Sequence, residues 1–159
     1  MKKPEKRELT IDLVPSTAFY SNLRSMLKRA DWDTIRRASY EKANYCCEIC
    51  GGKGKQHPVE CHEIWEFDDD TGVQQLMGVV SLCPNCHQAT HFGLAQHKGY
   101  GDKARKHIKK VNGFTDRTVD DMISSAFKLW EMRSEQEWEI DISWATKQGF
   151  EVKGPASCG

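Results

Sequence analysis

The sequence has no apolar run longer than a few residues, and no apolar stretch follows its charged start, MKKPEKRE. These absences argue against a transmembrane helix and a secretory signal, so we expect a cytoplasmic protein with no membrane partner. Internal repeats and low-complexity segments are also lacking. Its 23 Lys and Arg balance 23 Asp and Glu, so net charge does not indicate a simple polyanion binder. At 159 residues and 38% hydrophobic, residues 1–159 are expected to form a single domain.

The charges are unevenly distributed along the chain. Residues 56–93 contain no Lys or Arg and 6 Asp and Glu, whereas residues 1–55 contain 12 basic and 7 acidic residues. Residues 94–113 are basic again, with 6 basic residues and 1 acidic residue, and the remainder is acidic, with 5 and 9. An acidic centre suits a bound cation, and basic flanks suit a phosphate backbone. The alternative is chance patchiness of solvated faces.

Four of the seven cysteines form two Cys-x2-Cys pairs, Cys47/Cys50 and Cys83/Cys86, separated by 32 residues. Without an export signal, metal thiolates are a better interpretation than disulfides. Zn²⁺ prefers four soft ligands in a tetrahedron, so this pattern predicts a structural zinc site. A redox role for the first pair is disfavoured because no thioredoxin-like βαβ pattern surrounds it.

Of the three other cysteines, Cys46, Cys61 and Cys158, the first two have weaker assignments. Cys46 could replace Cys47, because its spacing to Cys50 is also tolerable for a metal site, although Cys47 completes the commoner knuckle. Cys61 falls in the middle of a predicted strand, on the face opposite His62, and is expected to be a small buried residue.

A hairpin followed by a helix is predicted between and after the cysteine pairs. Alternating residues indicate a strand over 59–67, a turn at 69–72, a returning strand over 79–82 and a helix over 83–95. On that helix, His87 and His91 would project from one face with Cβ atoms about 6 Å apart. With His62 on the first strand, three imidazoles can converge. The alternatives are that His87 only donates to a zinc thiolate and that His91 is simply exposed.

Both flanks of this centre are predicted to be mainly helical. A basic helix over 103–112 follows a capping Asp102 and can lie along phosphates, although an exposed helix flank is the alternative. Its candidate phosphate-binding residues are Lys103, Arg105, Lys106, Lys109 and Lys110, with Arg36 and Arg37 as a weaker second set. The other expected elements are a helix from Ser16 or Thr17 to about Lys28, a helix capped by Asp31 through Asn44, a helix from Thr115 or Asp116 through about Arg133, and a strand over 138–142.

The order Cys-x2-Cys, Glu-x-His-x-Ile and LC-x2-CH-x3-H resembles the HNH endonucleases, the ββα-metal or His-Me finger family, in its subgroup with a four-cysteine zinc. Residues 46–92 carry this resemblance, and the flanks are more weakly similar to bacterial and phage HNH proteins. It implies an α+β fold with a treble-clef-like, zinc-stapled ββα-metal core, a helical extension over 1–45, and a helical extension with a short strand over 94–159.

The resemblance also implies a function, metal-dependent hydrolysis of phosphodiester bonds in DNA that leaves a 5′ phosphate. His62, His87 and His91 would bind a catalytic divalent metal, Mg²⁺, Mn²⁺, Ni²⁺ or Zn²⁺. Glu63 occupies the position of the usual general-base His and would activate water, while the usual Asn falls on Gly78. Shifting the alignment by one residue would instead make His62 the base and put Cys61 at the metal position. The alternative function is a catalytically degenerate, zinc-stabilised module that binds nucleic acid or protein.

Overall fold

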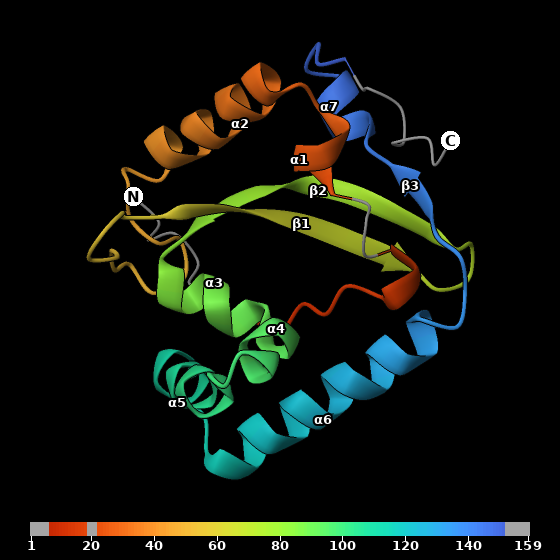
Figure 1. Cartoon of the computed structure of the whole chain (residues 1–159). Helices are drawn as coiled ribbons and strands as arrows, with labels where there is room; N and C mark the ends of the chain where they lie inside the picture. Colours follow the sequence, from red (N-terminus) through yellow and green to blue (C-terminus); the bar gives the residue numbers. More distant parts are fainter. Residues whose placement is uncertain (1–6, 19–21, 152–159) are drawn as a thin grey trace.

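The computed structural model describes residues 7–18 and 22–151 and has a mixed α+β fold. A three-stranded sheet in the order β1-β2-β3 runs through the middle, and helices cover both of its faces (Figure 1). The described elements are the 3-10 helix η1 (Ser16–Ala18), α1 (Leu23–Met26), α2 (Arg29–Lys42), β1 (Glu60–Asp68), β2 (Val73–Leu82), α3 (Pro84–Thr90), α4 (Phe92–His97), α5 (Gly101–Asn112), α6 (Asp116–Arg133), β3 (Glu139–Asp141) and α7 (Ser143–Thr146).

Strands β1 and β2 form the predicted antiparallel hairpin, but β2 is longer than expected because it begins at Val73. The register shifts between Ile64 and Trp65, where Met77 is the additional residue of a β-bulge. Gly78 follows it with φ +154°, and a Cβ there would lie 3.7 Å from Nε1 of Trp144. The positive φ favours glycine at the bulge, whereas the 3.7 Å approach to Trp144 is an ordinary van der Waals contact that leaves room for a Cβ.

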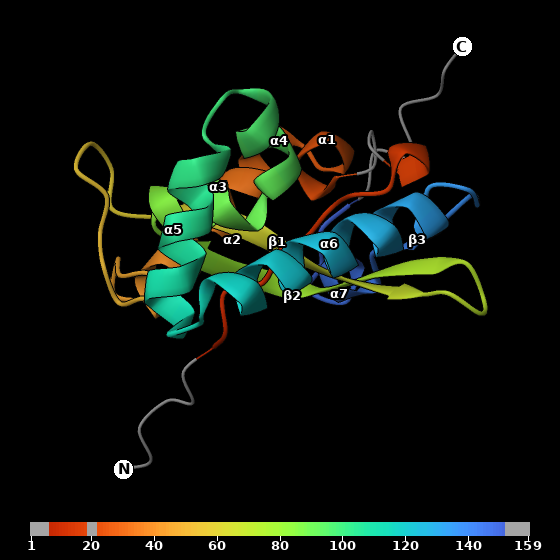
Figure 2. The same ribbon diagram turned by 90° about the horizontal axis from the view of Figure 1, so that it is seen from below.

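Two apolar clusters lie on opposite faces of the sheet. Val80 and Leu82 of β2 pack with α3, α4, α5 and α6 in the first cluster. Leu76 packs in the second with helices α1 and α2 and with α7, because the bulge changes which face the alternating side chains occupy. Figure 2, viewed from below, shows α5 and α6 in front of the sheet, on the face away from α2.

The prediction of one helix from Ser16 or Thr17 to about Lys28 is wrong, because the described residues form the separate short helices η1 and α1. Asn22 is extended and caps a separate helix, α1, and Leu27 and Lys28 are extended again. The second helix begins at Arg29, before the expected cap, so Asp31 lies in its first turn and contributes favourable charge there. Residues 19–21 fall outside the described part of the chain.

The remaining helices follow the sequence more closely. The predicted helix over 83–95 is interrupted at His91, whose φ and ψ of −89° and 51° end α3 and begin α4. Helix α5 begins at Gly101, so Asp102 lies in its first turn, and α6 begins as predicted after the capping Thr115. Strand β3 pairs in parallel with β2. No helix within the described residues is long and apolar enough to cross a membrane.

Two candidate metal centres

Four cysteine sulfurs form the first centre. Cys47, Cys50, Cys83 and Cys86 place their sulfurs within 4.8 Å of one another, so they could hold a metal ion. Local backbone geometry turns these sulfurs inward: Gly51 has φ +77°, and Gly52 N–H donates to Cys50 Sγ at 3.3 Å. In the second pair, Cys86 N–H donates to Cys83 Sγ at 3.4 Å as the cap of α3. The predicted convergence of the two pairs is confirmed.

The thiols of Cys47, Cys83 and Cys86 differ in their pKa values. Hydrogen bonds from Cys83 and Cys86 lower the pKa of Cys47. The bond with Cys47 in turn raises the pKa of Cys83 to about 11 and raises that of Cys86 as well. One thiolate is therefore stabilised at the expense of its neighbours. Because four thiolates would repel one another at this distance, a cation is needed to hold all four deprotonated.

Cys46 is outside this group, so the alternative in which it replaces Cys47 is not supported. Burial raises the pKa of Cys61 to about 12, as expected for a thiol that stays neutral in a half-buried position. A residue that the sequence did not assign to this centre is His107 of α5, whose Nε2 lies 3.2 Å from Cys86 Sγ. His107, rather than His87, is therefore the histidine that contacts a cysteine of the cluster.

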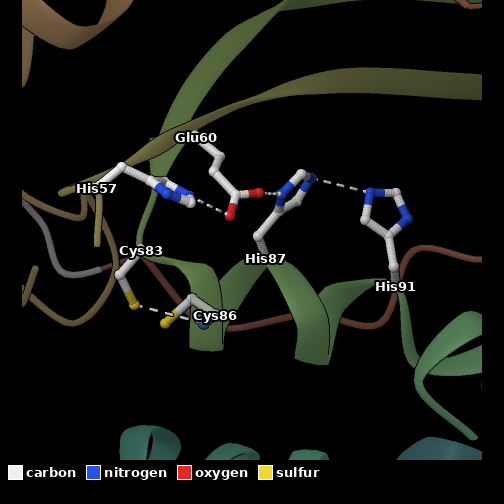
Figure 3. Close-up of polar contacts among 6 residues, drawn as sticks. All are labelled: His57, Glu60, Cys83, Cys86, His87 and His91. Carbon is white, nitrogen blue, oxygen red and sulfur yellow. Dashed lines mark hydrogen bonds and ion pairs between the residues drawn. The ribbon is translucent and has the colours of Figure 1, made fainter. Parts of the chain in front are cut away.

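Three histidines form the second centre. His62 from β1, His87 from α3 and His91 from the α3–α4 junction each offer a nitrogen within 4.8 Å of the others. His62 is 7% exposed, and Nε2 of His87 lies 3.1 Å from Nε2 of His91. The arrangement arises because α3 is packed against β1 and continues from the second cysteine pair, as Figure 3 shows for Cys83, Cys86, His87 and His91.

The imidazoles on the helix are kept neutral. Burial lowers the pKa of His91 to about 4, and repulsion from the protonated forms of His62 and His87 adds to the shift. Burial also lowers the pKa of His87, although the hydrogen bond to Glu60 opposes this shift. Both rings therefore present a lone pair to a metal ion at neutral pH, which is the form that metal binding requires.

Glu60 orients His87, a contact that sequence reasoning missed. Its Oε2 lies 2.6 Å from His87 Nδ1, and its Oε1 lies 2.9 Å from Nε2 of the exposed His57 (Figure 3). Burial raises the pKa of Glu60, but the hydrogen bonds from His57 and His87 outweigh it, so its pKa lies below the ordinary value. A carboxylate that accepts the Nδ1–H of His87 leaves the lone pair of the ring on Nε2, the nitrogen that faces His91. Many metal-binding histidines are held by a carboxylate in this way.

Glu63 was predicted to be the general base beside the three histidines. This prediction is wrong, because its side chain does not lie at the histidine centre. Strand alternation directs its side chain to the opposite face, where Oε1 accepts the Leu23 N–H at 2.6 Å and Oε2 accepts the Trp65 Nε1–H at 2.9 Å. Burial raises the pKa of Glu63 against these hydrogen bonds. The carboxylate thus holds the N-terminus of α1. The shifted alignment is also unsupported, because Cys61 lies on this same face.

The basic residues of α5 fall into two sets. Arg105 pairs with Asp120, and Lys109 lies 3.1 Å from Asp116, so α6 neutralises this side of the helix. The other side borders a hollow against α3, lined by Asn85, Gln88, Lys103, Ala104, Lys106, His107 and Lys110. Within the described residues, no acidic partner is found for its three lysines.

The second candidate set for nucleic acid, Arg36 and Arg37, lies on α2 and therefore across the sheet from α5 (Figure 1). Arg36 is engaged by Asp33 at 2.8 Å. These arginines cannot extend the basic surface of α5. The acidic residues 68–70 lie at the end of β1 and in the hairpin turn, where Asp68 accepts two backbone N–H groups and Asp69 pairs with Arg133.

Comparison with known proteins adds no assignment to this geometry. No protein-family model matches the sequence, and neither a curated protein nor a solved structure is significantly similar to the chain.

Proposed function

We propose that this chain is a metal-dependent endonuclease of the HNH type that hydrolyses phosphodiester bonds in DNA. The observation that carries this proposal is the convergence of His62, His87 and His91 beside a four-cysteine cluster, with both groups sharing helix α3. The β1-β2 hairpin followed by α3 supports interpreting this region as a zinc-stapled ββα-metal core. The four cysteines would hold a structural Zn²⁺, for which four thiol ligands are a suitable set.

The three histidines could hold a divalent ion, which when bound would neutralise charge that develops on a phosphate. Among the candidate ions, imidazole ligands suit Ni²⁺ and Zn²⁺ better than Mg²⁺ and Mn²⁺, which prefer oxygen ligands. His62 contributes from β1, His87 from α3 and His91 from the α3–α4 junction. Burial lowers the pKa values of His87 and His91, so both imidazoles remain neutral and can donate a lone pair to the ion. Glu60 holds the His87 ring through Nδ1. Glu63 has no part in this mechanism.

A second function, a zinc-stabilised module that binds nucleic acid or protein without cutting it, is favoured by one observation. The strand residue expected to act as base, Glu63, is committed to the N-terminus of α1. If the chain is such a binding module, His62, His87 and His91 would stabilise the fold without binding a metal, and only the cysteine cluster would hold a metal ion.

Metal analysis beside a cleavage assay separates these functions. Purified protein should contain one zinc per chain and should bind one further divalent ion. With Mg²⁺, Mn²⁺, Ni²⁺ or Zn²⁺ supplied in turn, it should cut supercoiled plasmid DNA. One metal per chain and intact plasmid with every ion would reject the nuclease and favour the binding module.

The lysines on the hollow side of α5 are expected to contact DNA phosphates. Changing Lys106 and Lys110 together to Gln should reduce the slope of log affinity against log salt by up to about 2, because each phosphate contact contributes about 0.9. The matched control, Arg105→Gln with Lys109→Gln, removes two charges from the same helix but should change the slope much less, since Asp120 and Asp116 already neutralise them.

This comparison is made by fluorescence anisotropy with a labelled DNA duplex, using protein whose folding is verified by circular dichroism. Equal reductions in slope for both double variants would mean that the ion pairs with α6 do not matter for binding. An unchanged slope for Lys106→Gln with Lys110→Gln would place the DNA on another surface.

A further inference from the structure

Asp12 is an acidic residue at the histidine centre that no motif in the sequence marks. Its Oδ2 lies 3.1 Å from Nε2 of His62, across 50 positions of sequence. Its other oxygen, Oδ1, accepts a hydrogen bond from Thr10 Oγ1 at 2.9 Å. Both carboxylate oxygens are therefore engaged, and one of them is directed at an imidazole of the proposed metal centre.

The backbone around Asp12 is fixed on both sides by long-range contacts. Asn112 exchanges two hydrogen bonds with the main chain of Leu9, at 2.9 and 2.8 Å, and Leu9 is fully buried. Asp12 N–H itself donates to the Thr90 carbonyl at 2.9 Å. This last bond ties Asp12 to the end of α3, next to His91. The backbone that carries the carboxylate is consequently held beside the centre by the fold.

Asp12 also lies at the boundary between the histidine centre and solvent. The side chain is 49% exposed, whereas that of His62 is 8% exposed. The carboxylate of Asp12 thus lies between solvent and a buried imidazole, on the outer side of the centre.

We propose that Asp12 is a positioning residue of the three-histidine centre, holding the His62 ring through Nε2 and placing a negative charge beside the bound divalent cation. This inference rests on the proposed function only in assuming that a metal ion binds at His62, His87 and His91. A carboxylate that contacts a metal-binding histidine restricts its ring and strengthens it as a ligand, and loss of such a contact typically weakens metal binding 10- to 100-fold.

The test is a titration with Co²⁺ of full-length protein whose cysteine site has first been filled with zinc. Asp12→Asn keeps the shape of the side chain and removes its charge. We expect it to weaken Co²⁺ binding at least about 10-fold and to change the visible Co²⁺ spectrum. Asp12→Ala should weaken binding by as much or more. The matched control is Asp70→Asn, which removes an exposed carboxylate in the hairpin turn and should leave both the affinity and the spectrum unchanged.

Zinc content and thermal melting of each variant distinguish the outcomes. Parental affinity and spectrum in Asp12→Asn would overturn the inference and leave the nuclease proposal standing. Weaker Co²⁺ binding that is accompanied by zinc loss or by a large drop in melting temperature would also overturn it, because Asp12 would then serve the fold generally. If the parent protein itself binds no second metal, the proposed function fails together with the inference.

Discussion

Cys86→Ser is expected to leave the chain unable to fold stably. The side chain is fully buried, and its sulfur belongs to the cluster that joins the loop before β1 to the start of α3. A structural zinc contributes about 10 kcal/mol or more to the folding of small zinc domains, which is comparable to the whole stability of a typical domain. Zinc analysis, circular dichroism and thermal melting should therefore show loss of metal together with loss of cooperative unfolding.

The control for this experiment is Cys46→Ser, which changes the cysteine next to the cluster without removing one of its four sulfurs. It should retain one zinc per chain and melt close to the parent protein. Removing zinc from the parent with a strong chelator should reproduce the behaviour of Cys86→Ser. A soluble Cys86→Ser protein that melts like the parent would contradict a structural metal at the cysteines.

His91→Ala is expected to abolish the second metal and to reduce DNA cleavage by at least about 100-fold. The magnitude follows because charge stabilisation by a catalytic metal is worth several kcal/mol, and each 1.36 kcal/mol changes the rate tenfold. Zinc at the cysteines should remain at one per chain, since His91 lies outside that cluster. Metal analysis and the initial rate of plasmid nicking, measured with the best-supporting ion, are the two readouts.

Glu63→Gln is the informative comparison for His91→Ala. Its side chain lies across the sheet from the histidines, where it caps α1, so the variant should retain both metals and cut DNA at nearly the parental rate. Some loss of melting temperature is expected, because a neutral amide is a weaker acceptor for the N–H groups at a helix N-terminus. Loss of cleavage in Glu63→Gln, with both metals and folding intact, would restore Glu63 as a catalytic residue.

The sequence determined the parts of these centres that depend on local spacing. Two cysteines separated by two residues place their sulfurs together in a single turn of chain, and His87 and His91, four residues apart, lie on one side of α3 and its C-terminal cap. The turn at residues 69–72 joined β1 to β2, which placed His62 opposite that helix. Strand alternation also separated His62 from Glu63, so the sequence already contained the evidence against using both residues at one site.

Only the tertiary structure decided which side chains surround these residues. Glu63 meets Leu23 and Arg24 across about 40 positions, Asp12 meets His62 across 50, and Asn112 holds Leu9 across 103. In place of the long helix predicted after Ser16 the structure has η1 and α1, and Glu63, 40 positions away, accepts the Leu23 N–H at the start of α1. Local spacing sets the geometry of neighbours in the chain. Packing against the sheet brought distant segments together, and it therefore placed Asp12, rather than Glu63, beside the histidines.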